Sequence, residues 1–300
     1  MHPVKLSLTS TVLLAAPLAA LLLIEGPLPA GRGQGPAVPS VAAKPAPQAG
    51  DAPIELLREA LWSAGESRLE YWNGPLDLTR EFYFTRAFYR DRGWDRFRGF
   101  PSWSVDFPKA DIQFMMGLKR LVNHLDAYEY ENPIALDDPQ LWNFPFLYAV
   151  EVGHMQLTDA EVKGLRRYLL AGGFFLVDDF WGTAEWRIFE SEIRRVLPEF
   201  QIVDIPLDHP LFHSFYDVEE IVQVPNVGNA LSGGPTWEKD GYEPKVRGIF
   251  DDEGRLLVGI NFNCDLGDAW EWAEHPRYPL PFSTYAYQMG INFILYAMSH

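Results

Sequence analysis

The chain has 300 residues, of which 47% are hydrophobic and 22% are charged, so a packed core is expected rather than disorder. Its formal net charge of −16 argues against a nucleic-acid partner, because phosphate binding requires concentrated Lys and Arg. Cys264 is the single cysteine, which excludes an intramolecular disulfide and a zinc site built from several cysteines.

The N-terminal segment has the pattern of a targeting sequence. Lys5 supplies a short positive region, residues 11–24 are apolar, and Leu28-Pro-Ala30 provides a small-residue cleavage site. We interpret residues 1–30 as a signal peptide, with an uncleaved N-terminal anchor as the alternative. In either case we expect the rest of the chain to be extracytoplasmic, periplasmic or secreted, and to contact a membrane only through such an anchor.

Residues 31–53 are rich in Gly, Ala and Pro and contain almost no large apolar side chains. Such a segment buries too little surface to order itself, which indicates a linker. We interpret residues 54–300 as a single α/β domain.

Strand and helix patterns alternate through this domain. Helical spacing of apolar residues predicts helices over 54–69, 110–125, 183–196 and 284–298, and a further helix between Thr158 and Gly172. Alternating or continuous apolar runs predict strands over 81–89, 144–150, 174–177, 201–205, 246–250 and 256–261. We expect the last two strands to form a C-terminal β-hairpin. The alternation predicts a mostly parallel sheet with helices on both faces.

The helix that follows Thr158 has the clearest boundaries. Thr158 and Glu161 have the spacing of a capping box, in which the hydroxyl and the carboxylate satisfy free backbone donors reciprocally. An apolar stripe follows at helical spacing, and Gly172 suits the C-terminal end. The strand over 174–177 begins immediately afterwards.

Several stretches together carry a resemblance to a known family. They are FYFTRAFY (82–89), Trp103…Asp106-Phe-Pro108, LLAGGFFLVDDFWG (169–182), NCDLGDAWEW (263–272) and GINFILYAM (290–298). Through them, the region from about 80 to 298 resembles the bacterial domain of unknown function 4159, within the class I glutamine amidotransferase-like superfamily. The resemblance implies a flavodoxin-like α/β sandwich and no established activity, so function has to be argued from the site.

One feature of catalytic glutamine amidotransferases is missing from this chain. Those enzymes carry a cysteine on a Gly-x-Cys-x-Gly elbow after a strand, at a helix N-terminus that lowers the thiol pKa. Here the matching strand runs into DDFWG (178–182), which has no thiol or hydroxyl nucleophile. Cys264 lies elsewhere, beside Asp265, and an acidic neighbour raises a thiol pKa. We therefore do not expect a cysteine-dependent amidotransferase or peptidase.

Asp178 and Asp179, followed by Trp181, stand where ligands usually bind in an open α/β sheet. An extended strand would direct the two carboxylates to opposite sides, so at most one would face a given cleft. Two interpretations stay open. The pair contributes to a ligand or metal site, or it accepts backbone N–H groups of the next helix and complements its dipole.

A second acidic stretch, residues 261–268, has oxygen side chains at alternating positions, as calcium loops do. It departs from that motif, because the sixth position is Leu266 instead of Gly and the twelfth is Trp272 instead of Glu. The simpler interpretation is a strand end followed by a loop in which Asp268 caps a helix over 269–272.

Asn263, Asp265 and Asp268 are nevertheless candidate ligand-binding residues. If their loop lies beside Asp178 and Asp179, the four carboxylates would repel one another unless a cation or protons intervened. A Mg²⁺ or Ca²⁺ site would follow from that arrangement, although no metal or cofactor is assigned from the sequence.

Arg86 and His154 complete the set of candidates. Arg86 lies within a strand of aromatic residues, where it would be either a buried partner for an acidic residue or a ligand clamp. His154 follows the strand over 144–150 and would line the same crevice. His209 and His213 are four residues apart but lack an H-E-x-x-H context, so no zinc site is expected.

The leading hypothesis is a non-catalytic extracytoplasmic module that binds a small ligand or an envelope protein. The alternative is a carboxylate- or metal-dependent hydrolase acting on cell-envelope glycan or peptide, with Asp178 or Asp179 paired with Asp265 or Asp268 as acid and base. Tryptophans on loops beside these carboxylates would suit stacking on sugar rings.

Overall fold

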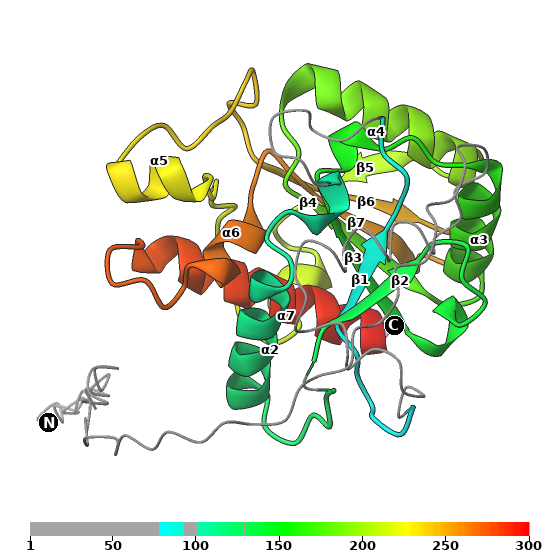
Figure 1. The fold of residues 1–300 in the computed structure, drawn as a ribbon, viewed down its shortest axis with the longest axis horizontal. Helices are drawn as coiled ribbons and strands as arrows, with labels where there is room; N and C mark the ends of the chain where they lie inside the picture. Colours follow the sequence, from blue (N-terminus) through cyan, green and yellow to red (C-terminus); the bar gives the residue numbers. More distant parts are fainter. Residues whose placement is uncertain (1–77, 93–100, 129, 300) are drawn as a thin grey trace, which may run out of the picture. The chain divides into compact units, whose positions relative to one another are not determined.

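The computed structural model describes residues 78–92, 101–128 and 130–299, which form an α/β fold around one seven-stranded sheet (Figure 1). The predicted signal peptide, linker and helix over 54–69 lie outside these residues. The strands are β1 (Thr85–Phe88), β2 (Asn132–Ala135), β3 (Phe146–Val150), β4 (Phe174–Asp178), β5 (Ile202–Asp204), β6 (Lys245–Phe250) and β7 (Leu256–Phe262). The α-helices are α2 (Lys109–Leu121), α3 (Asp159–Leu170), α4 (Gly182–Val196), α5 (Val227–Ser232), α6 (Leu266–Glu271) and α7 (Leu280–Ser299).

The sheet has the strand order β2-β1-β3-β4-β7-β6-β5 and is mostly parallel, as predicted. The four pairings from β2 to β7 are parallel, whereas β6 runs antiparallel to both β7 and β5. Because β3, β4 and β7 run in the same direction, their C-terminal ends meet at one edge of the sheet. We call this the carboxyl edge; its strands end at Val150, Asp178 and Phe262.

Helices cover both faces of the sheet, as predicted (Figure 1). On one face, Tyr148 and Leu176 pack with residues of α2, α6 and α7. On the other face, their sequence neighbours Ala149 and Val177 pack with residues of α3 and α4. Successive strand residues point to opposite faces, so strands buried on both sides must be continuously apolar.

Most of the predicted elements are present, with boundaries shifted by a few residues. The strand predicted over 81–89 is reduced to β1, and the helix predicted over 110–125 ends at Leu121. Sequence patterns missed β2, which has only four residues and includes Pro133. Among the described residues, no helix is both long enough and apolar enough to cross a membrane.

The capping box at the start of α3 is confirmed. The Thr158 backbone N–H donates to Glu161 Oε2 at 2.7 Å, and the Glu161 backbone N–H donates to Thr158 Oγ1 at 3.2 Å. Gly172 follows the helix with φ +115°, a conformation that L side chains rarely adopt. The chain can therefore turn directly from α3 into β4.

Candidate functional site

The two acidic loops predicted from the sequence lie side by side at the carboxyl edge. The Asp179 backbone N–H donates to the Cys264 carbonyl at 3.1 Å, and the Asn263 N–H donates to the Phe180 carbonyl at 3.1 Å. They are neighbours because β4 and β7, which precede them, pair in parallel. The loop that contains Asp265 therefore lies beside Asp178 and Asp179, which is the arrangement in which we expected the carboxylates to repel one another.

Asp178 is buried and its carboxylate accepts four hydrogen bonds. Oδ2 accepts from the backbone N–H groups of Leu266 (2.8 Å) and Gly267 (3.2 Å) and from the Tyr148 hydroxyl (2.9 Å), while Oδ1 accepts from Asn261 Nδ2 (2.6 Å). Burial raises the pKa of Asp178 to about 6, although these hydrogen bonds favour the ionised form. Asp178 thus holds the start of α6.

Of the two interpretations left open for Asp178 and Asp179, capping of the next helix does not agree with the structure. The helix after β4 is α4, and the backbone N–H groups of residues 181, 182 and 183 donate to Glu185 (2.6 Å), Asn263 (2.9 Å) and Asp240 (2.8 Å), respectively. Asp178 caps the more distant α6 instead, because the parallel neighbour β7 delivers that helix to the same edge.

Asp179 forms a sharp turn between β4 and α4. Its φ of 50° is left-handed, an unfavourable conformation for a residue with a β-carbon. The strand alternation expected for Asp178 and Asp179 therefore stops at Asp178. Asp179 is 6% exposed, and its Oδ1 accepts from Trp181 Nε1 at 3.0 Å.

Three carboxylates converge at this turn, and we call them the three-Asp cluster. Asp106, Asp179 and Asp265 each offer one carboxylate oxygen, and these atoms all lie within 4.8 Å of one another. Asp106 comes from the loop before α2 and, with φ 61°, is also left-handed. Asp265 is the N-cap of α6, and its Oδ1 accepts from the Asp268 backbone N–H at 2.7 Å.

Burial and mutual repulsion act together on the three-Asp cluster. Burial raises the pKa of Asp179 well above its usual value, and the charges of Glu151 and Asp106 raise it further. Burial likewise raises the pKa of Asp265, with added contributions from Asp179 and Asp268. The pKa of Asp106 is raised by burial and then by Asp268. The cluster therefore favours protons or a cation over three free negative charges.

Two polar oxygens at this site are buried without a hydrogen-bond partner. One is Asp106 Oδ2, and the other is the hydroxyl of Tyr278, a residue that is 7% exposed. Burial raises the pKa of Tyr278, and the charges of Asp265 and Asp268 raise it further. Buried polar groups are almost always satisfied in native proteins, so both oxygens require an explanation.

Asp268 is positioned differently from its prediction. Its Oδ2 accepts from the backbone N–H of Val227 at the start of α5. The interpretation that Asp268 caps a helix over 269–272 is wrong, because the helix begins at Leu266 and Asp265 is its N-cap. One oxygen of Asp268 also lies within 4.8 Å of oxygens of Asp106 and Glu271.

Arg86 and Asn263 are engaged in contacts within the fold. Arg86 is fully buried, pairs with Asp111 through Nε at 3.3 Å, and lies 4.7 Å from the ring centroid of Tyr148. This is the buried-partner alternative of the sequence interpretation. Asn263 caps α4 through Oδ1 and donates through Nδ2 to the Glu243 carbonyl at 2.7 Å.

His154 belongs to a second charged group at the end of β3. Its Nε2 lies 3.5 Å from Glu151 Oε2 and 3.4 Å from Glu185 Oε1, and the hydrogen bond that it donates to the Glu185 carboxylate raises the pKa of His154. Lys239 also pairs with Glu185. This group is an ion-pair network; the Glu151 backbone N–H connects it to the Asp179 carbonyl at 3.0 Å.

Cys264 is not placed to act as a nucleophile. It is fully buried, its Sγ accepts from the Val224 backbone N–H at 3.4 Å, and burial raises its pKa to about 12. The thiolate is the nucleophilic form of cysteine, so this thiol is inert.

The sequence profile of a family described as "Domain of unknown function (DUF4159)" matches residues 98–298. The chain belongs to this family. The DUF4159 region contains all three members of the three-Asp cluster, together with Tyr278. A search of curated proteins found no match.

Sequence reasoning selected Asp179 and Asp265 but missed Asp106, Glu151 and Tyr278. Glu151 directly follows a continuous apolar run, the same strand-end signal that selected Asp178. Asp106 stands in a loop with no preceding strand, and its only signal was its place among the stretches that carry the family resemblance. No local pattern marks Tyr278.

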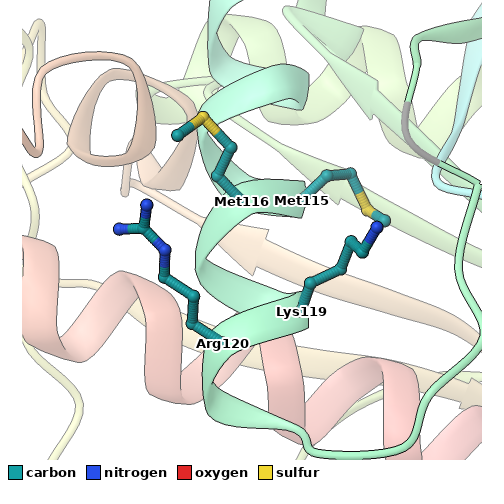
Figure 2. A pocket seen from close by; sticks show the side chains of 4 residues that line it. All are labelled: Met115, Met116, Lys119 and Arg120. Atoms are coloured by element: carbon teal, nitrogen blue, oxygen red, sulfur yellow. The ribbon is translucent and has the colours of Figure 1, made fainter.

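A pocket of about 330 Å³ lies elsewhere, on the surface of α2 (Figure 2). It is lined by Met115, Met116, Lys119 and Arg120. None of these residues belongs to the three-Asp cluster, so this pocket and the carboxylate chemistry are separate features.

Proposed function

We propose that this DUF4159 chain is an extracytoplasmic ligand-binding module whose ligand engages the three-Asp cluster. The observation that carries the proposal is the meeting of three carboxylate oxygens within 4.8 Å at the end of β4. In open α/β sheets, ligands bind outside the carboxyl ends of the strands. The extracytoplasmic location rests on the targeting pattern of residues 1–30.

The scaffold we propose is flavodoxin-like and glutamine amidotransferase-like, with a C-terminal β-hairpin. The parallel part of the sheet has the order β2-β1-β3-β4-β7, which corresponds to the flavodoxin-like order 2-1-3-4-5. The antiparallel pairing of β6 with β7, which are adjacent in the chain, supports the hairpin. Asp179 then stands at the turn where related enzymes carry a cysteine nucleophile.

Two physical arguments favour binding over a purely structural role. Asp178 demonstrates that this edge can satisfy a buried carboxylate completely, with four hydrogen bonds. Asp106 Oδ2 receives none, and both Asp106 and Asp179 adopt left-handed backbone conformations. Backbone strain and unsatisfied charge at one position are typical of functional sites, where a ligand provides the missing interaction.

A second function is a carboxylate- or metal-dependent hydrolase acting on envelope glycan or peptide. It is favoured by the position of Asp179 on a strained strand-to-helix turn, the arrangement that presents nucleophiles in other α/β enzymes. Carboxylates serve as nucleophiles in glycosidases, and Asp265 would act as the acid–base partner.

Binding and turnover of a soluble peptidoglycan digest by the full chain separate these functions. For the binding module, we expect the digest to raise the melting temperature of the wild type without releasing new fragments. Asp179→Asn and Asp265→Asn should abolish this shift, and the exposed control Asp252→Asn should retain it. Fragment release that Asp179→Asn abolishes would favour the hydrolase. A shift that survives both cluster variants would overturn the proposed site.

A further inference from the structure

We propose that the three-Asp cluster binds one oxygen-preferring divalent cation, with Ca²⁺ favoured over Mg²⁺. The inference rests on the proposed function, because it identifies what the ligand-binding site contains. Asp106, Asp179 and Asp265 would each supply one oxygen.

The spacing of these oxygens fits a shared ion. Calcium–oxygen distances are about 2.3–2.6 Å, so two ligands of one ion lie at most about 5 Å apart. The three carboxylate oxygens lie within 4.8 Å of one another, which meets this limit without any rearrangement of the backbone. They come from three separate segments, the loop before α2, the end of β4 and the start of α6, so the tertiary structure brings them together.

The unpartnered oxygens provide the second, independent observation. Tyr278 is only 7% exposed, its hydroxyl has no hydrogen-bond partner, and the charges of Asp265 and Asp268 act on it. Asp106 Oδ2, which faces Gly267 at the start of α6, is also buried without a donor. A cation would either coordinate each of these oxygens directly or carry a bound water that donates a hydrogen bond to it. The contrast with the neighbouring Asp178, whose carboxylate accepts four hydrogen bonds, indicates that the missing donors are specific to the cluster.

The basic side chains near the carboxyl edge are already committed to other partners. Arg86 pairs with Asp111, and Lys239 pairs with Glu185. Lys109 lies 4.5 Å from the ring centroid of Trp272. Within the described ranges, no Lys or Arg forms an ion pair with a member of the three-Asp cluster. An exogenous cation is therefore the available counter-charge.

The number of carboxylates favours calcium. Mg²⁺ keeps several waters and is usually held by one or two carboxylates, whereas Ca²⁺ accepts six to eight oxygens in flexible geometry. Three carboxylates, a tyrosine hydroxyl and the nearby Asp268 make an oxygen-rich site of high negative charge.

The test is isothermal titration of the chelator-treated full chain with CaCl₂ and, separately, MgCl₂. We expect one Ca²⁺ per chain, bound at least about tenfold more tightly than Mg²⁺. Asp106→Asn and Asp265→Asn should each weaken binding by about tenfold or more, Tyr278→Phe should weaken it less, and Asp252→Asn should leave it unchanged. Circular dichroism of each chelator-treated variant establishes that the fold is retained.

Absence of binding by both ions up to about millimolar concentration would overturn the cation site, and shared protons would then neutralise the cluster. Binding that is insensitive to Asp106→Asn and Asp265→Asn would also overturn it. Should Asp106→Asn fail to fold, Tyr278→Phe and elemental analysis of the purified wild type decide the question. Digest binding that persists in chelator and requires Asp179 would overturn the cation site and support the proposed function. Calcium binding without digest binding would support the cation site and overturn the proposed function.

Discussion

The backbone N–H of Asp179 donates to the carbonyl of Cys264 at 3.1 Å, and this hydrogen bond joins the loops that follow β4 and β7. Asp178 and Asp179 are consecutive in the chain, but their carboxylates have opposite environments. The Asp178 carboxylate accepts four hydrogen bonds, whereas Asp179 faces other carboxylates. Opposite effects on stability are therefore expected when each is neutralised.

Asp178→Asn is expected to destabilise the protein by about 1–3 kcal/mol. The variant replaces one acceptor oxygen by an NH₂ group that faces donors such as the Leu266 N–H, so a buried donor loses its partner. Urea unfolding measures the loss, and Asp252→Asn is the exposed control. An unchanged free energy of unfolding would contradict the role of Asp178 in holding α6.

Asp179→Asn is expected to stabilise the chelator-treated protein by roughly 1 kcal/mol, the usual scale of a single stabilising substitution, because it relieves repulsion between neighbouring carboxylates. The substitution removes one charge from a close group of three carboxylates while preserving the shape of the side chain. Added Ca²⁺ should reverse the order and make the wild type the more stable protein. Destabilisation in chelator equal to that of Asp178→Asn would assign Asp179 a structural role instead.

The stability of the metal-free protein is expected to fall as the pH rises from about 4 to above 6. A carboxyl group whose folded-state pKa is raised binds more protons in the folded than in the unfolded state, so raising the pH favours unfolding. The pKa of Asp178 is raised to about 6, and those of Asp179 and Asp265 are raised as well. Carboxyls with lowered pKa values, such as Glu185, act in the opposite sense.

The difference in unfolding free energy between wild type and the double variant Asp179→Asn/Asp265→Asn isolates the cluster from these opposing groups. We expect the difference to grow as the pH rises through this window and to be smallest at pH 4. A difference that does not depend on pH would exclude raised pKa values at the cluster.

Gly267→Ala is expected to weaken calcium binding and to destabilise the fold by about 1–3 kcal/mol through overpacking. An added β-carbon would lie 2.5 Å from Asp106 Oδ2 and 3.2 Å from the Tyr148 hydroxyl. Helix propensity alone would favour alanine over glycine by about 1 kcal/mol. A loss of stability would therefore report the steric clash of the added β-carbon. Gly228→Ala in α5, whose nearest neighbour would be at 3.2 Å, is the control, and equal effects would refute this account.

Cys264 is expected to resist thiol reagents in the native protein and to react fully in denaturant. It is buried, and burial raises its pKa to about 12, so almost no thiolate is present at neutral pH. Colourimetric titration in buffer and in urea tests this expectation. Rapid native modification would reopen a cysteine-based mechanism.

Local patterns were sufficient for some of the site residues. Asp179 and Asp265 follow strands that are recognisable from apolar runs, and parallel strands bring their C-terminal ends to one edge. Arg86 was recognised as a charge within a buried strand, but its partner Asp111, 25 residues later, was not. Pairings across such a distance depend on how α2 packs against the sheet, which no local period encodes.

The sequence by itself determined the alternation of strands and helices, the strand ends that carry Asp178, Asp179 and Asp265, and the lack of a thiol or hydroxyl nucleophile at the turn after β4. Hydrophobic periodicity and the chemistry of individual side chains suffice for these features, because both are local. Only the tertiary structure decided that Asp178 holds α6 while Asp179 joins Asp106 and Asp265. That division depends on a parallel neighbour strand, a left-handed turn and a loop from another part of the chain. A carboxylate's role is set by which donors and charges surround it, and those neighbours are assembled only by folding.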